Sequence, residues 1–176
     1  MLNIVYSKVL KEIVILDVFC IGFLFVLRVV AGGVVAEVEL SHWIIVMSGL
    51  LALFLGFNKR RQELRSSDGE SPSHRKVLGQ YDVYFIDQMI AIVTSSIVVA
   101  YMLYTTDART TAFFGNKHIM ISIPFVYYGI FRYLYLIHKL NVGGDPTRIL
   151  FRDKNTQLNL VLWLVVCVGA IYIHVR

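Results

Sequence analysis

Charged residues are scarce in this chain. Asp, Glu, Lys and Arg make up 16% of the 176 residues, whereas hydrophobic residues make up 57%, and the mean hydropathy is +0.65. Soluble domains usually carry about a quarter charged residues. The low charge, together with several long apolar runs, excludes a soluble globular domain and indicates an integral membrane protein.

Cysteines are also few, and the sequence has no recognisable signal peptide. The two cysteines, Cys20 and Cys167, each lie in an apolar run, so we expect them to pack rather than to form a disulfide or a metal site. The opening stretch MLNIVYSKVLKE does not have the pattern of a secretory signal peptide. The sequence shows no internal repeat and no low-complexity segment. We expect no nucleic-acid partner.

Five apolar segments have the length that a membrane-crossing helix needs, roughly 17–25 residues. We therefore predict an all-α integral membrane protein, organised as a single transmembrane domain over residues 1–176. The expected transmembrane helices cover residues 13–36, 41–57, 83–104, 118–137 and 157–175.

Lysine and arginine are distributed unevenly between the two sides of these helices. Residues 1–12, 58–82 and 138–156 hold twelve of them, whereas the opposite side holds only Arg109, Lys117 and Arg176. Because basic loops remain in the cytoplasm, we predict that the N-terminus and both long basic loops are cytoplasmic. The expected location is a cytoplasmic membrane, with the bilayer itself as one partner.

Two charged residues lie in the first predicted helix. A charge near the bilayer centre costs at least about 2.5–3.5 kcal/mol, so each one needs a reason. Arg28 follows Asp17 by eleven residues, which is within about 20° of three full turns, so the two side chains could line one polar track. Alternatively, Arg28 is neutralised by a carboxylate on another helix, or it snorkels to the membrane surface.

Further charges lie near the predicted cytoplasmic ends of the helices. Arg132 lies among tyrosines in FVYYGIFRYLYLIHKL, and Asp87 lies in YFIDQMI. Arg132 and its neighbour Tyr133 either face a cytoplasmic-side pocket or belong to an aromatic belt at the membrane surface.

The stretch LFLGFNKRRQELRSS places four cations and one glutamate directly after an apolar run. Lys59 and Arg60 could hold a phosphate group, with Glu63 orienting either of them or reaching Mg²⁺ through water. We expect Arg61 and Arg65 to meet lipid headgroups instead. The alternative is that the whole stretch only fixes the topology.

The loop HKLNVGGDPTRILFRDKNT contains a strong turn signal followed by charged residues. Its carboxylates, Asp145 and Asp153, lie near Arg148. Mg²⁺ takes one or two carboxylates together with phosphate oxygens, so this loop suits a magnesium–diphosphate ligand. A solvated loop that anchors the protein at the membrane is the alternative.

Five segments, taken in order, resemble the UbiA superfamily of membrane prenyltransferases and, within it, the decaprenyl-phosphate phosphoribosyltransferase branch. The segments are YSKVLKEIVILDVF with GFLFVLRVVAGGV, LGFNKRRQEL, YDVYFIDQMIAIVTSS and YGIFRYLYLIHKLNVGGDPTRILFRDK. Other members of the superfamily carry an aspartate-rich DxxxD motif where this chain has KRRQE, and this difference favours the phosphoribosyl branch over prenylation of an aromatic ring.

The resemblance implies a nine-helix bundle with a cavity that opens to the cytoplasm, in which a polyprenyl phosphate attacks phosphoribosyl diphosphate and diphosphate leaves with Mg²⁺. The product would lie on the route to arabinose donors for the cell envelope. Together with the observations above, the resemblance to this family gives a set of candidate residues. Substrate binding is expected at Tyr6, Lys11, Lys59, Arg60, Glu63, Arg132, Tyr133, Asp145 and Arg148, and metal binding at Glu63, Asp145 and Asp153.

The family's first aspartate-rich motif, NDxxDxxxD, does not occur in this sequence. The five helices correspond to the C-terminal part of the family's bundle. We therefore expect either a truncated or split gene product, or a chain whose missing helices are supplied by a partner chain or a homo-oligomer. Two alternatives stay open: a prenyltransferase for an aromatic acceptor, and a non-catalytic membrane subunit whose intramembrane charges form closed pairs.

Overall fold

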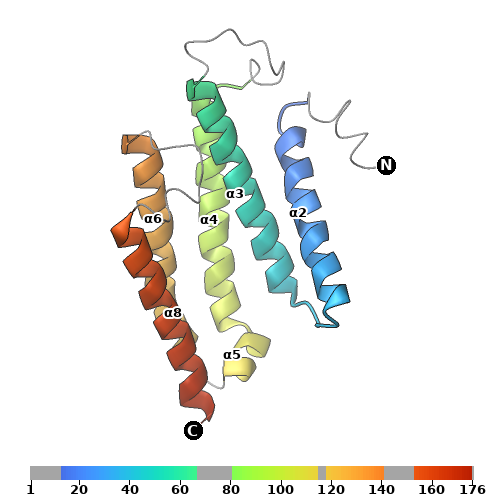
Figure 1. Ribbon diagram of the computed structural model, residues 1–176, viewed down its shortest axis with the longest axis vertical. Helices are drawn as coiled ribbons and strands as arrows, with labels where there is room; N and C mark the ends of the chain where they lie inside the picture. The colour runs from blue at the N-terminus through green and yellow to red at the C-terminus, as the bar shows by residue number, and fades with distance from the viewer. Residues whose placement is uncertain (1–12, 67–80, 115–117, 141–152, 176) are drawn as a thin grey trace. The chain divides into compact units, whose positions relative to one another are not determined.

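The computed structural model describes residues 13–66, 81–114, 118–140 and 153–175 (Figure 1). Five of its segments are long and apolar enough to cross a membrane, which confirms the prediction of an all-α membrane protein with five such helices. The elements, in order, are α2 (Leu16–Val35), α3 (His42–Ser66), α4 (Val83–Thr106), α5 (Ala108–Phe114), the 3-10 helix η3 (His118–Ser122), α6 (Ile123–Leu140) and α8 (Lys154–Val175).

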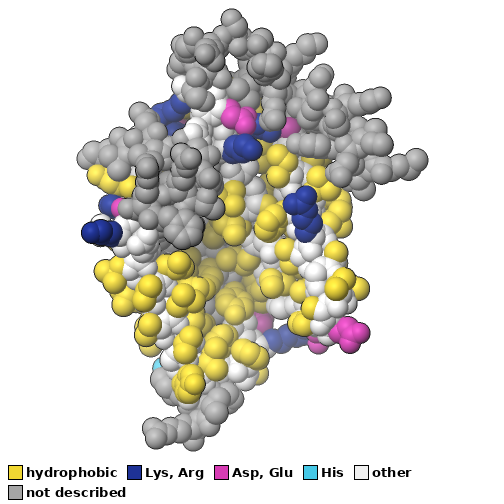
Figure 2. Space-filling model, in the orientation of Figure 1, with side chains coloured by type: hydrophobic (Ala, Val, Ile, Leu, Met, Phe, Trp, Pro, Cys, Tyr) yellow, Lys and Arg dark blue, Asp and Glu magenta, His cyan; other side chains and the backbone are white. Residues whose placement is uncertain are grey.

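The chain divides into two compact units. Unit 1 covers residues 1–97 and contains α2, α3 and α4 as far as Ile97. Unit 2 covers residues 98–176 and contains the rest of α4 together with α5, η3, α6 and α8. Hydrophobic side chains cover most of the visible length of the helices, as expected for surfaces that meet lipid (Figure 2).

In unit 1, α2 and α3 run side by side and approach each other closely at glycines (Figure 1). A Cβ atom added at Gly56 of α3 would lie 2.7 Å from Cγ1 of Val18, which is closer than real atoms pack. A Cβ added at Gly22 of α2 would lie 3.3 Å from Leu53. Small residues let membrane helices pack by direct backbone approach, and these glycines therefore set the spacing of α2 and α3.

The second transmembrane helix is longer than the sequence predicted. We expected it to end at residue 57, but α3 continues to Ser66 and carries the stretch NKRRQELR as regular helix. Lys, Arg, Gln, Glu and Leu are all good helix formers, and Arg60 and Glu63 form an i,i+3 ion pair that supports the helix. The cations therefore lie on a rigid element rather than in a loop.

The fifth helix begins earlier than expected, at Lys154 rather than at residue 157. Asp153 caps it: its Oδ2 atom accepts hydrogen bonds from the backbone N–H of Thr156 at 2.9 Å and from the Thr156 hydroxyl at 2.7 Å. A carboxylate that accepts from the third residue of a helix satisfies one of the free N–H groups of the first turn. The helix start is therefore fixed by this cap.

The interior of unit 2 combines apolar packing with polar contacts between helices. Phe114, Ile119 and Ala170 form a buried cluster against which Cys167 packs, so this cysteine has the packing role that we expected. The amide nitrogen of Asn159 in α8 donates to the backbone oxygen of Phe125 in α6 at 2.9 Å. These contacts hold α6 and α8 together within unit 2.

Candidate functional site

The last two turns of α3 carry the most polar buried surface of unit 1. Asn58, Arg60 and Arg61 are buried, whereas Lys59 between them is exposed. Successive helical residues differ by about 100° in direction, so Arg60 and Arg61 point toward different neighbours. Two guanidinium groups are thus enclosed at the end of unit 1 where α3 finishes and α4 begins.

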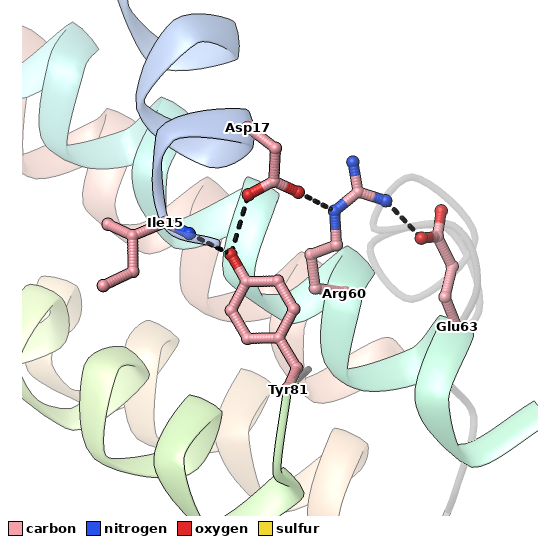
Figure 3. Close-up of polar contacts among 5 residues, drawn as sticks. All are labelled: Ile15, Asp17, Arg60, Glu63 and Tyr81. Carbon is pink, nitrogen blue, oxygen red and sulfur yellow. Dashed lines mark hydrogen bonds and ion pairs between the residues drawn. The ribbon is translucent and has the colours of Figure 1, made fainter. Parts of the chain in front are cut away.

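Arg60 is shared between carboxylates of two helices (Figure 3). Its Nε atom donates to Oδ2 of Asp17, at the start of α2, at 2.7 Å, and its Nη1 atom donates to Oε2 of Glu63 on α3. The Asp17 and Arg60 side chains are 1% and 5% exposed, so both charges are removed from water. The third nitrogen, Nη2, points away from both carboxylates in Figure 3.

Tyr81, two residues before α4, completes this cluster. Its hydroxyl donates to Oδ1 of Asp17 at 2.7 Å and accepts the backbone N–H of Ile15 at 2.6 Å (Figure 3). Ile15 has a φ of 73°, which is rare for a β-branched residue. Burial, and then the hydrogen bond to Asp17, raise the pKa of the Tyr81 phenol above its usual range. Tyr81 therefore remains a neutral donor that fixes the entry into α2.

Arg61 pairs with α4. Its Nε atom lies 2.5 Å from Oδ1 of Asp87 and its Nη2 atom lies 3.5 Å from Oδ2. The expectation that Arg61 meets lipid headgroups is wrong, because its side chain is only 2% exposed. The direction about 100° beyond Arg60 leads to α4 and not to the membrane surface.

The charges of this ionic cluster, which we define as Asp17, Arg60, Arg61, Glu63 and Asp87, nearly cancel. Three carboxylates face two guanidinium groups. An arginine has five N–H donors, and the contacts above use only two of those of Arg60. Arg60 is thus held in a fixed position within the cluster, and Lys59, the preceding residue, is exposed.

The predicted polar track of Asp17 and Arg28 does not form. Asp17 is buried against Arg60, whereas Arg28 is exposed. The two residues share an angular position on α2, but only Asp17 is within reach of a long side chain from α3. Asp17 and Arg28 therefore point in the same direction from α2, but one side chain is buried and the other is exposed.

In unit 2, Arg132 of α6 binds the residue that caps α8. Its Nε and Nη2 atoms lie 3.0 and 2.7 Å from the two carboxylate oxygens of Asp153, and its guanidinium carbon lies 5.3 Å from the centre of the Tyr135 ring. The hydrogen bonds from Arg132 and then those from Thr156 hold the pKa of Asp153 well below its usual range. Arg132 and Asp153 therefore form a two-pronged bridge between α6 and α8.

The structure describes some of the remaining predicted site residues and not others. Tyr133 is half-buried and packs against Leu136 and Ile137 in unit 2. Four predicted binding residues lie outside the described residues, namely Tyr6, Lys11, Asp145 and Arg148. Of the set, the structure brings together Arg60 and Glu63 in unit 1, with Lys59 exposed beside them, and Arg132 with Asp153 in unit 2.

No known family model matches the chain. It is 26% identical to the decaprenyl-phosphate phosphoribosyltransferase of Mycolicibacterium smegmatis, in an alignment that covers 97% of this chain and 55% of the relative. Proteins of the same name from Corynebacterium glutamicum and Mycobacterium tuberculosis are 27% and 25% identical, covering 93% and 96% of this chain and 49% and 54% of the relatives. The chain is a homologue of these transferases. The resemblance to this branch is thereby confirmed, and the chain spans about half the length of the curated relatives it matches.

The described part of this transferase homologue does not form a magnesium site from protein ligands alone. Among the residues that the structure describes, no group of three or more His, Cys, Asp or Glu side chains is placed to hold a metal. Asp153, a predicted ligand, is engaged by Arg132 and Thr156 instead. Glu63 is bound to Arg60 but is 30% exposed, so one of its sides still faces outward.

Sequence reasoning missed two contributors to the ionic cluster. Tyr81 lies outside the predicted helices and carries no charge, so no pattern singled it out. The pairing of Asp17 with Arg60 could have been found from a simpler signal: both charges lie at the same end of neighbouring antiparallel helices, and buried charges in membranes are usually paired.

Proposed function

We propose that this chain belongs to a membrane phosphoribosyltransferase, in which it transfers phosphoribose from phosphoribosyl diphosphate to a polyprenyl phosphate. The names of its homologues support this reaction. The observation that carries the proposal is Arg60, a buried guanidinium that Asp17 and Glu63 hold in a fixed position next to the exposed Lys59.

In the proposed reaction, a phosphate oxygen of the lipid attacks the anomeric carbon of the ribose. The bond from that carbon to the diphosphate oxygen breaks, and diphosphate leaves with the bonding electrons. Negative charge therefore grows on the leaving group, and fixed cations placed beside it lower the barrier. Arg60 is positioned by Asp17 and Glu63 before substrate arrives, and Lys59 adds a mobile point charge.

In this proposal, Mg²⁺ would bind to the protein together with the diphosphate group of the substrate. Mg²⁺ accepts one or two carboxylates and completes its shell with phosphate oxygens and water. Glu63 is the described carboxylate best suited to that role, because it lies beside Arg60 and is partly exposed. We further propose a place in the synthesis of arabinose donors for the cell envelope, in a bacterial cytoplasmic membrane, with residues 58–82 and 138–156 on the cytoplasmic side. A partner chain or a second copy would complete the site.

A non-catalytic membrane subunit is the second candidate, and one observation favours it. Asp17, Arg60, Glu63, Arg61 and Asp87, which lie within the helices of unit 1, are joined in ion pairs with one another. Such pairs can serve helix association alone. Only a measurement of transfer separates the two candidates.

The test compares membranes from cells that express the chain with membranes from the same cells without it. Transfer of label from phosphoribosyl diphosphate to polyprenyl phosphate is measured in both. We expect Lys59→Ala to raise the KM for phosphoribosyl diphosphate by about tenfold, which corresponds to the loss of about 1.4 kcal/mol of phosphate binding. Because Lys59 is exposed, the amount of protein should not change.

Arg65→Ala is the matched control, since Arg65 is another exposed cation at the end of α3. It should change the KM by less than about twofold. If the chain adds no transfer activity, either alone or co-expressed with the partner chain, the non-catalytic candidate holds. If both substitutions change the KM equally, the stretch acts through its overall charge and not through a phosphate site.

A further inference from the structure

Arg28 is an exposed charge in the middle of a membrane-crossing helix of unit 1. It lies eleven residues after Asp17 and seven before Val35, which is about 16 Å and about 10 Å along the axis of α2. Helical side chains lean toward the N-terminus, so Arg28 leans toward the more distant end. Neither membrane surface is therefore within easy reach of its guanidinium group.

The five membrane-crossing segments that the structure describes have no carboxylate at the depth of Arg28. The membrane-crossing segments contain three acidic residues, Asp17, Glu63 and Asp87. All three lie at the end where α3 finishes and α4 begins, and each is paired with Arg60 or Arg61. The other acidic residues of the sequence lie outside these segments. A second copy of the chain would have the same deficit.

Arg28 belongs to the side of α2 that faces away from α3. Val26 contacts α3 near Gly49, and Arg28 points about 200° away from Val26. We define the Arg28 face as Ile21, Phe25, Arg28, Gly32 and Val35, all of which are exposed. A Cβ added at Gly32 would meet nothing within 4 Å, so another helix has room to approach closely.

We propose that the Arg28 face binds a transmembrane helix that is not one of the five that the structure describes and that carries an aspartate or glutamate at mid-membrane depth. Charged groups within membranes pair with one another, and a carboxylate is the partner that neutralises a guanidinium with two hydrogen bonds. Lipid phosphates lie at the membrane surface and not at this depth. A symmetric contact with a second copy through this face would bring two Arg28 side chains together, which like charges oppose.

The probe is a synthetic leucine-rich transmembrane peptide with a single aspartate at its centre. The full chain, with a donor fluorophore on an N-terminal tag, is reconstituted with acceptor-labelled peptide in phosphatidylcholine vesicles, and energy transfer is measured. We expect the central-Asp peptide to bind at least about tenfold more tightly than a peptide with leucine there. Aspartate near the peptide end should give no such gain.

Arg28→Leu should abolish the preference, and Arg28→Asp should transfer it to a peptide with a central arginine. Both variants replace an exposed side chain, so the helix fold should persist, which circular dichroism checks. Arg109→Leu, which removes an exposed arginine outside the membrane-crossing segments, should change nothing.

A preference that persists in Arg28→Leu, or equal binding of the leucine peptide, overturns the proposal. Energy transfer between two labelled copies that Arg28→Leu abolishes would assign the face to a second copy of the chain and would also overturn it.

Discussion

The two units use arginine–aspartate pairs in contrasting ways. In unit 1, the Arg60 side chain is 5% exposed and joins carboxylates of α2 and α3. In unit 2, the side chains of Arg132 and Asp153 are 24% and 15% exposed, and the aspartate is also a helix cap. In both units the aspartate uses both of its oxygens and the arginine uses two of its nitrogens, so the pairs differ in their exposure to water and not in the number of contacts.

This contrast separates two roles that look alike in the sequence. Removing one member of a buried pair leaves an uncompensated charge and costs about 3–5 kcal/mol, whereas partly exposed pairs contribute far less because water replaces the lost partner. The unit 1 cluster therefore stabilises the fold through buried charges, and its proposed role in binding would depend on the same contacts, whereas the unit 2 bridge mainly fixes where α8 begins.

The largest effect is expected from Asp17→Ala. This change leaves Arg60 buried with only Glu63 as partner, so we expect a loss of about 3–5 kcal/mol in the free energy of unfolding. Equilibrium unfolding by SDS in mixed micelles, followed by circular dichroism, measures it. Replacing both Asp17 and Arg60 by leucine should restore much of the loss. If the double variant is no more stable than Asp17→Ala, the burial of the charge is not the cause.

A smaller effect is expected from Tyr81→Phe, which keeps the ring and removes only the hydroxyl. Asp17 then loses a hydrogen bond, and the N–H of Ile15 loses its acceptor. Hydrogen bonds to charged groups contribute about 1.5–3 kcal/mol, and we expect a loss of that size in the same unfolding measurement. Tyr84→Phe is the matched control, because Tyr84 is an exposed tyrosine of the same unit. Equal losses in both variants would contradict a specific role for the Tyr81 hydroxyl.

The smallest effect is expected at Asp153. Asp153→Ala removes the cap of α8 and the partner of Arg132, and loss of a cap costs about 0.5–2 kcal/mol. Because the folded state lowers the pKa of Asp153, its stabilisation is complete above the ordinary carboxyl pKa of about 3.9 and is lost as the pH falls below that value.

Unfolding of the chain at a series of pH values, followed by tryptophan fluorescence from Trp163 in α8, tests this second property. Asp153→Asn keeps an oxygen that can cap the helix but cannot titrate. The variant should lose the contribution of Asp153 to the acid dependence. If the free energy of unfolding depends on pH in the same way in the wild-type chain and in the variant, Asp153 does not contribute to the acid dependence.

The sequence predicted the helices well because apolar length alone determines them. It predicted their ends poorly at residues 57 and 157, where α3 continues on good helix formers and α8 starts at a capping aspartate. Of the candidate site, the adjacency of Arg60 and Glu63 followed from helical spacing. The contact with Asp17 is set by how α2 and α3 pack, and the contact with Tyr81 by the path of the chain before α4. Neither contact can be predicted from the spacing of residues along one helix.

The distance in sequence between Asp17 and Arg60 has a consequence for biosynthesis. The two residues are 43 positions apart, and Tyr81 follows Asp17 by 64. At about 5–20 residues per second, a ribosome completes α2 about 1–5 seconds before Arg60 is made. During that interval the nascent α2 holds an unpaired carboxylate at its start and Arg28 near its middle. The α2–α3 hairpin is thus the shortest nascent segment in which Asp17 meets its cation, so these two helices should settle into the bilayer as a pair.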